Sequence, residues 1–108
     1  MPRVALIPGD GIGTEVVPQA RRVLEAVARA EGLDFQLTDW DLGAERYLRD
    51  GVTITEGEFR SLAEDHDAIL LGALGDPRVP GNEQVRDILL GLRFRLDLYV
   101  NYRPCVLL

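Results

Sequence analysis

The residues best suited to chemistry lie in the segment 85–104, where arginines alternate with branched apolar side chains. Four of them share the spacing i, i+3, i+4 and i+7, which is one face of an α-helix: Arg86, Leu89, Leu90 and Arg93. Arg103 precedes Pro104, which favours an extended backbone. Arginines from a helix and an extended segment suit a ligand with two carboxylates, because each guanidinium binds one carboxylate through two hydrogen bonds. Ordinary ion pairing with the surplus acidic residues explains the same spacing equally well.

A second candidate is the glycine-rich turn Gly9–Gly13, which follows an apolar run and precedes a helical pattern. A strand, a glycine turn and a helix in this order can present backbone N–H groups to a phosphate. A Rossmann fingerprint, however, needs glycine where this sequence has Thr14. The spacing therefore favours a sharp turn that needs glycine for backbone reasons over a dinucleotide-binding turn.

The remaining reactive side chains are isolated in the sequence. We interpret His66, which lies between two aspartates, as a solvated surface histidine. Ser61 lies on a predicted helix without a G-x-S-x-G turn, which argues against nucleophilic catalysis. Cys105 is the only cysteine, and we expect it to be packed rather than reactive. We expect most carboxylates at the surface and predict no metal site.

Composition narrows the class of protein. The chain has 108 residues, with 12 arginines, no lysine and 18 acidic residues, and a net charge of −6. An apolar fraction of 46% fits a globular protein with one modest core. The chain has no basic stripe, which argues against nucleic-acid binding. The apolar run Ala68–Leu74 is far shorter than the about 20 residues of a membrane span, and we expect a cytoplasmic protein without membrane contact.

Strand and helix patterns alternate along the chain. Alternating or continuous apolar runs predict strands at Val4–Ile7, Phe35–Trp40 and Asp67–Leu74, the last buried on both faces, and an extended segment at Leu98–Asn101. Helical spacing is found from Thr14, the expected N-cap, to near Gly32, and in Ala44–Leu48, Thr55–Ala63 and Val85–Phe94. This alternation predicts an α/β fold with a parallel sheet and helices on its faces.

Four motifs occur in a characteristic order: Ile7–Gly13, Leu70–Pro77, Leu89–Arg93 and Asn101–Pro104. With them the sequence resembles the amino-terminal part of the β-decarboxylating dehydrogenases, and most closely the isopropylmalate-oxidising members of that family. The resemblance implies an incomplete three-layer sheet-and-helix domain of isopropylmalate dehydrogenase type, which is not a Rossmann fold. Family members are roughly three times this length, so we expect residues 1–108 to be the amino-terminal part of the first domain.

The resemblance also implies a reaction. The family oxidises a 2-hydroxy dicarboxylate with NAD and releases the adjacent carboxyl group as CO₂ with the help of Mg²⁺ or Mn²⁺. By resemblance, Arg93 and Arg103 hold the carboxylates of the malate moiety, and Leu89 lies against the alkyl group of the substrate. Three further residues approach the cofactor by the same resemblance: Ile12, Gly75 and Asp76.

The family's catalytic residues and metal ligands lie beyond residue 108, so we expect no catalytic residue or metal ligand here and no activity from residues 1–108 alone. A homodimer is implied for the full-length enzyme. Three positions depart from the family pattern: Ile88, Tyr102 and Val106. The substrate implied is 3-isopropylmalate, in leucine biosynthesis. A tartrate, malate-type or homoisocitrate dehydrogenase, or a non-catalytic fragment, are the alternatives.

Overall fold

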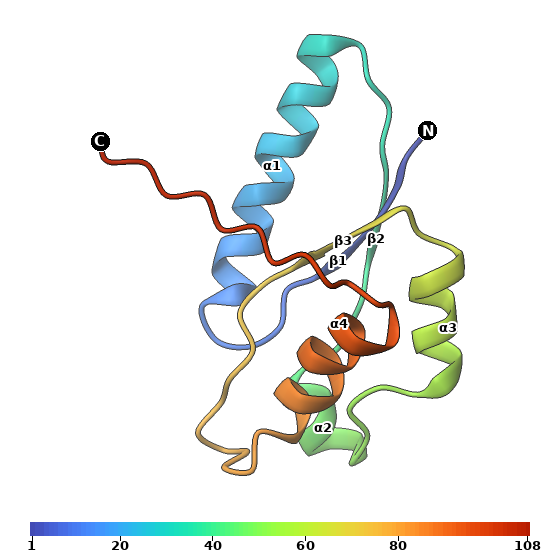
Figure 1. Cartoon of the computed structure of the whole chain (residues 1–108), viewed down its shortest axis with the longest axis vertical. Coiled ribbons are helices and arrows are strands. Elements are labelled where there is room, and N and C mark those ends of the chain that lie inside the picture. The colour runs from blue at the N-terminus through green and yellow to red at the C-terminus, as the bar shows by residue number, and fades with distance from the viewer.

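The computed structural model describes residues 1–108 and has three layers (Figure 1). The middle layer is a parallel sheet in the order β2-β1-β3, formed by β1 (Arg3–Ile7), β2 (Gln36–Asp39) and β3 (Ala68–Leu71). One face carries α1 (Gly13–Glu31). The other carries α2 (Ala44–Asp50), α3 (Glu56–Glu64) and a last helix made of η1 (Val85–Leu90) and α4 (Gly91–Arg95). The predicted layered α/β arrangement is confirmed.

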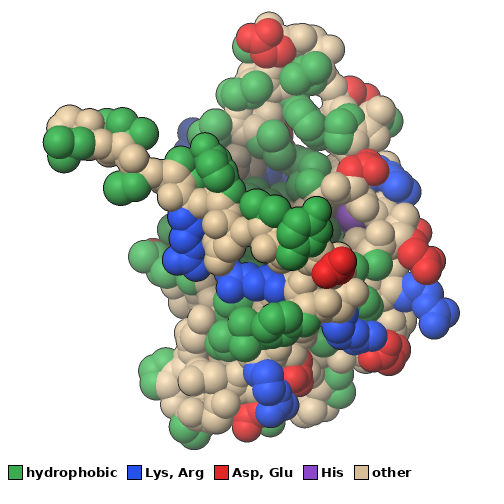
Figure 2. Space-filling model, viewed as in Figure 1, with side chains coloured by type: hydrophobic (Ala, Val, Ile, Leu, Met, Phe, Trp, Pro, Cys, Tyr) green, Lys and Arg blue, Asp and Glu red, His purple; other side chains and the backbone are tan.

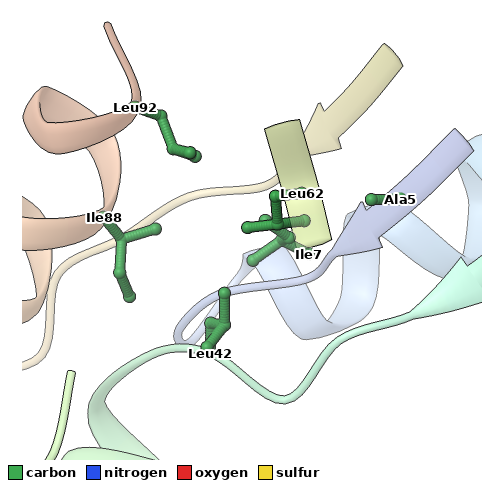
Figure 3. Packing of buried hydrophobic residues seen from close by; sticks show 6 residues of the cluster. All are labelled: Ala5, Ile7, Leu42, Leu62, Ile88 and Leu92. Atoms are coloured by element: carbon green, nitrogen blue, oxygen red, sulfur yellow. The ribbon is translucent and has the colours of Figure 1, made fainter. Parts of the chain in front are cut away.

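The two faces of β1 build the two halves of the core. Ala5 and Ile7 point into a cluster with residues from the helical layer opposite α1, namely Leu42, Leu62, Ile88 and Leu92 (Figure 3). Val4 and Leu6 point the other way and pack on Val17 of α1. Successive side chains of a strand point to opposite faces of the sheet. Because β1 is apolar on both faces, the helices of both outer layers pack against it.

The prediction for Asp67–Leu74 is wrong in both extent and burial. Only Ala68–Leu71 is a strand, and its residues are half-buried or exposed. The reason is the strand order, because β3 lies at the edge of the sheet. Beside it an apolar cavity of about 430 Å³, which we name the α1–β3 groove, is open to solvent; it is lined by Val4, Ala20, Val23, Leu24, Val27, Ala68, Ile69 and Leu70.

Two helix boundaries lie where the sequence predicts them, and the start of α1 does not. The C-cap of α1 is Gly32 at φ 64°, where the helical pattern was expected to end. Thr55, the first residue of the predicted segment Thr55–Ala63, is the N-cap of α3 and forms a capping box with Glu58 that was not predicted. The predicted N-cap Thr14 is wrong. The cap position is Ile12, and the hydroxyl of Thr14 donates to the carbonyl oxygen of Gly11 at 2.7 Å from inside the helix.

The last helix covers the predicted segment Val85–Phe94, but its first six residues form a π-helix. After α4 the chain continues as an exposed tail (Figure 1), without a strand at Leu98–Asn101. Cys105 is exposed in this tail, so the expectation that it is packed is wrong.

None of the helices combines the length and the apolar character that crossing a membrane requires.

Candidate functional site

The turn after β1 packs directly against the loop after β3. Gly9 has a φ of +81°, and a Cβ there would lie 2.2 Å from the carbonyl oxygen of Ala73. A Cβ on Gly13 would lie 2.1 Å from the carbonyl oxygen of Pro8. Both glycines are therefore required by the close approach of backbone segments, which confirms that this turn needs glycine for backbone reasons.

Asp10 joins this turn to three other elements, a role that the sequence analysis did not identify. Asp10 is 4% exposed, which makes it an exception to the expectation that most carboxylates lie at the surface. Oδ1 accepts from the backbone N–H of Ala44 at 2.6 Å, and Oδ2 accepts from the N–H of Gly75 at 2.8 Å and from Nε2 of Gln84 at 3.2 Å. The only indication in the sequence is that Asp10 lies among glycines, which are typical of places where backbone segments approach closely.

The residues expected near a cofactor gather at the carboxyl ends of β1 and β3. Ile12 is 65% exposed beside the glycine turn, and Gly75 is exposed in the adjacent loop. A Cβ on Gly11 or Gly75 would meet no atom within 4 Å, so both sites are open to a ligand. The strand order reverses between β1 and β3, which is the place where open α/β sheets bind ligands.

Asp76 is held as an anion in that loop. Arg78 donates to its carboxylate from Nε at 3.0 Å and from Nη2 at 2.7 Å, and the backbone N–H of Arg78 adds a bond at 2.9 Å. These hydrogen bonds, the guanidinium first and the backbone second, lower the pKa of Asp76 to about 2. The hydrogen bonds to Asp76 first, and to Glu45 second, in turn raise the pKa of Arg78. The loop therefore presents a fixed ion pair beside the glycine turn.

Arg93, expected to bind substrate, is half-buried on α4 and faces a cavity of about 360 Å³. The cavity is lined by Leu90, Arg93, Phe94, Asp97, Leu98, Tyr99 and Asn101. Leu89 is half-buried and does not line it. The i→i+5 bonding of η1 widens the helical turn before Gly91, so the spacing that put Leu89, Leu90 and Arg93 on one face of an α-helix does not hold there.

Arg103 lies in the exposed tail and donates from Nε to Oδ1 of Asn101 at 3.0 Å. Asn101 thus borders both the cavity of Arg93 and the guanidinium of Arg103. Neither Arg93 nor Arg103 forms an ion pair, whereas Arg86 pairs with Asp87 at 2.8 Å. Arg86 therefore forms an ordinary ion pair, which was the alternative explanation for the arginine spacing. The guanidinium groups of Arg93 and Arg103 have no carboxylate partner in this structure and are free to bind a carboxylate of a ligand. Figure 2 shows arginine side chains on the face crossed by the tail.

The remaining candidate groups are structural. His66 is half-buried and packs in an edge arrangement with Trp40, at 5.7 Å between ring centroids, so it is not the solvated surface residue that we expected. Ser61 lies on α3 as predicted, and its hydroxyl donates to Asp65 at 2.8 Å. No three His, Cys, Asp or Glu side chains lie together in a way that could hold a metal ion.

Comparison with known proteins gives concordant results. The sequence profile of the isocitrate/isopropylmalate dehydrogenases matches residues 3–108. The 3-isopropylmalate dehydrogenase of Corynebacterium kroppenstedtii is 54% identical over 106 residues, which are 97% of this chain and 31% of the relative. That of Leifsonia xyli is 49% identical over 109 residues, 97% of this chain and 30% of the relative. The chain therefore spans about a third of the length of these relatives.

A solved structure agrees with this assignment. The crystal structure of the β-decarboxylating dehydrogenase from Thermococcus kodakarensis, in its apo form, superposes with a TM-score of 0.72 at 36% identity. The match covers 92% of this chain and 28% of that protein.

Proposed function

This chain belongs to the isocitrate/isopropylmalate dehydrogenase family, and on that premise we propose that it supplies part of the substrate and cofactor cleft of an NAD-dependent enzyme that oxidises and decarboxylates 3-isopropylmalate. The names of its relatives from Corynebacterium and Leifsonia support this choice of substrate. We assign the enzyme to leucine biosynthesis in the cytoplasm and expect it to work as a homodimer.

The observation that carries the proposal is that two arginines without ion pairs, Arg93 and Arg103, both lie next to Asn101, in a chain with 18 acidic residues. A guanidinium that is free of carboxylate partners can bind a carboxylate of the ligand through two parallel hydrogen bonds. One arginine comes from a helix and the other from the tail, and Asn101 lies between them. In the proposed enzyme the two arginines hold the two carboxylates of the malate moiety.

The apolar neighbours of Arg93 support an alkyl-bearing substrate. Leu90 lines the cavity of Arg93, and Leu89 precedes it on the same helix. An alkyl group gains free energy when it is buried against leucine, whereas a third carboxylate would lose its hydration there without gaining a partner. The site is therefore expected to prefer isopropylmalate to isocitrate.

For NAD, the open glycine positions and the exposed Ile12 at the ends of β1 and β3 fit the close approach of a dinucleotide. In the proposal Ile12, Gly75 and Asp76 would contact the cofactor, which would supply the oxidising chemistry by taking up a hydride from the substrate. Residues 1–108 do not fit a Mg²⁺ or Mn²⁺ site, because they bring no set of ligands together, so we derive no metal-dependent step from this chain.

The test uses an enzyme in which residues 1–108 replace the matching part of the Corynebacterium kroppenstedtii relative, which we call the joined enzyme. It should form NADH with isopropylmalate and Mn²⁺, and more slowly with isocitrate or tartrate. Arg93→Ala and Arg103→Ala should each lower kcat/KM about ten- to a hundredfold, since each loses a hydrogen-bonded charge pair.

Arg29→Ala is the matched control, because Arg29 is exposed on α1, which lies on the opposite face of the sheet from the helix of Arg93, and it should leave kcat/KM unchanged. A preference of the joined enzyme for tartrate or isocitrate would replace the proposed substrate. Turnover by residues 1–108 alone would contradict the assignment of the catalytic groups to the remainder of the enzyme.

A further inference from the structure

Asp10 is a buried carboxylate without a positively charged partner. Its acceptor oxygens are occupied by two backbone N–H groups and one amide, from Ala44, Gly75 and Gln84. These donors come from the start of α2, the loop after β3 and the residue before η1. A carboxylate suits this place because it accepts on both oxygens, whereas every other polar side chain of this size also carries a donor or has a single oxygen.

Gln84 is fully buried, and only one end of its amide is used. Nε2 donates to Asp10 at 3.2 Å, while Oε1 has no hydrogen-bond partner. A buried acceptor without a donor is unfavourable. Packing alone would be better served by an apolar side chain of the same length, so the bond to Asp10 is the contribution that the amide of Gln84 makes here.

From these contacts we infer that Asp10 is a positioning residue that holds the Gly75–Asp76 loop directly, and the helix bearing Leu89 and Arg93 through Gln84, in fixed register with the glycine turn. The inference rests on the proposed function, because it assigns the loop to NAD and the helix to the substrate. It predicts that the two connections can be broken separately, with separate kinetic effects.

Asp10→Asn should release the loop. The asparagine oxygen can accept from only one of the two backbone N–H groups. Ala44 is fully buried and its N–H has no other partner, whereas Gly75 is exposed and its N–H can bond to water. The oxygen is therefore kept by Ala44, and the new NH₂ group faces Gln84, whose amide can turn to accept through Oε1. The variant should keep α2 in place and lose the connection to Gly75.

Gln84→Met should release the helix instead. Methionine is unbranched and fills nearly the same space, but it has no N–H to donate. Both backbone bonds of Asp10 remain, and the unpaired Oε1 is removed. Only the connection from the glycine turn to the segment that carries Leu89 and Arg93 is then lost.

In the joined enzyme, Asp10→Asn should raise KM for NAD about ten- to a hundredfold, as expected for one hydrogen bond to a charged group, with KM for isopropylmalate unchanged. Gln84→Met should raise KM for isopropylmalate and leave KM for NAD unchanged. The control is Val17→Ala, which removes buried apolar contacts on the opposite face of the sheet. It should lower the folded fraction and leave both KM values unchanged. Parallel changes in both KM values, or no change in either, would overturn the inference.

Hydrogen exchange gives a readout that does not depend on activity. In the joined enzyme, the amide of Gly75 should exchange about ten- to a hundredfold faster in Asp10→Asn than in wild type, Val17→Ala or Gln84→Met, with Ala44 remaining protected. If wild type oxidises no isopropylmalate, the proposed function fails. Faster exchange at Gly75 would then still support the role of Asp10, and equal exchange in all variants would overturn it.

Discussion

Arg78 donates hydrogen bonds to the carboxylate of Asp76 from both its side chain and its backbone, at 2.7 Å from Nη2 and 2.9 Å from N. The two residues are separated by one proline, so the pair closes the loop after β3 on itself. Arg78 also reaches Glu45 on α2. The loop that we assign to the cofactor is therefore fixed to the helical layer through an ion pair and to the glycine turn through Asp10.

The first prediction concerns pH. The pKa of Asp76 is about 2 in the folded protein and about 3.9 in an unfolded chain. The folded state thus binds fewer protons, so the pair stabilises the fold above about pH 4, and this contribution is lost as the pH falls towards 2. A carbon NMR titration of the Asp76 carboxyl should show a midpoint near 2 in the joined enzyme. In Arg78→Met it should move up towards about 3.9, and an unmoved midpoint would contradict the assigned cause.

The second prediction separates the two leucines before Gly91. Leu89→Ala should raise KM for isopropylmalate about tenfold or more if Leu89 meets the alkyl group, with little effect on tartrate, which has no alkyl group. Leu90→Ala tests the residue that lines the cavity of Arg93. A selective effect of Leu90→Ala without one of Leu89→Ala would transfer the alkyl contact to Leu90. Equal losses for both substrates would indicate packing roles.

The third prediction concerns two helical glycines. A Cβ on Gly57, inside α3, would meet nothing closer than Thr55 Oγ1 at 4.0 Å, so Gly57→Ala should increase the free energy of unfolding by about 0.5–1 kcal/mol. Gly13→Ala, whose Cβ would lie 2.1 Å from the carbonyl oxygen of Pro8, should decrease it by at least about 1–3 kcal/mol. Urea unfolding of the joined enzyme measures both, and similar values for the two variants would refute the packing argument.

The fourth prediction concerns residues 1–108 on their own. The α1–β3 groove is wholly apolar, and Val23 and Val27 on its rim are 64% and 45% exposed. The isolated chain should bind a fluorescent apolar dye and associate in sedimentation experiments. The double change Val23→Arg with Val27→Glu should reduce both, whereas Val16→Arg on the same helix, outside the groove, should not. A stable monomer that binds no dye would refute the prediction.

Local signals in the sequence were sufficient for most element boundaries. Gly32 ended α1 and Thr55 began α3 as predicted, because a left-handed C-cap and a capping box are formed by residues close together in sequence. The burial of β3 was not predictable in this way. An apolar run looks the same in a central strand and an edge strand, and the difference depends on the strand order.

In the candidate site, too, some features could be predicted from the sequence and others depend on contacts between distant residues. The family resemblance indicated Arg93 and Arg103 as substrate-binding residues. Whether an arginine forms an ion pair could not be predicted, because it depends on the positions of carboxylates that are distant in the sequence. The buried role of Asp10 needed donors from Ala44, Gly75 and Gln84, which are between 34 and 74 positions away. The π-helical turn at Val85–Leu90 left no mark in the apolar spacing, since Ile88 and Leu92 reach the core in either kind of helix.

The central position of β1 has a consequence for biosynthesis. Its residues are made before those of either neighbour, and its partner in β3 begins at Ala68, 64 positions after Val4. At about 5–20 residues per second, ribosomes need about 3–13 s to cover that distance. During this interval an apolar strand has at least one unpaired edge, which is a template for pairing with other nascent chains. Slower emergence from the ribosome of the residues between β1 and β3 would lengthen this interval and would therefore lower the yield of folded protein.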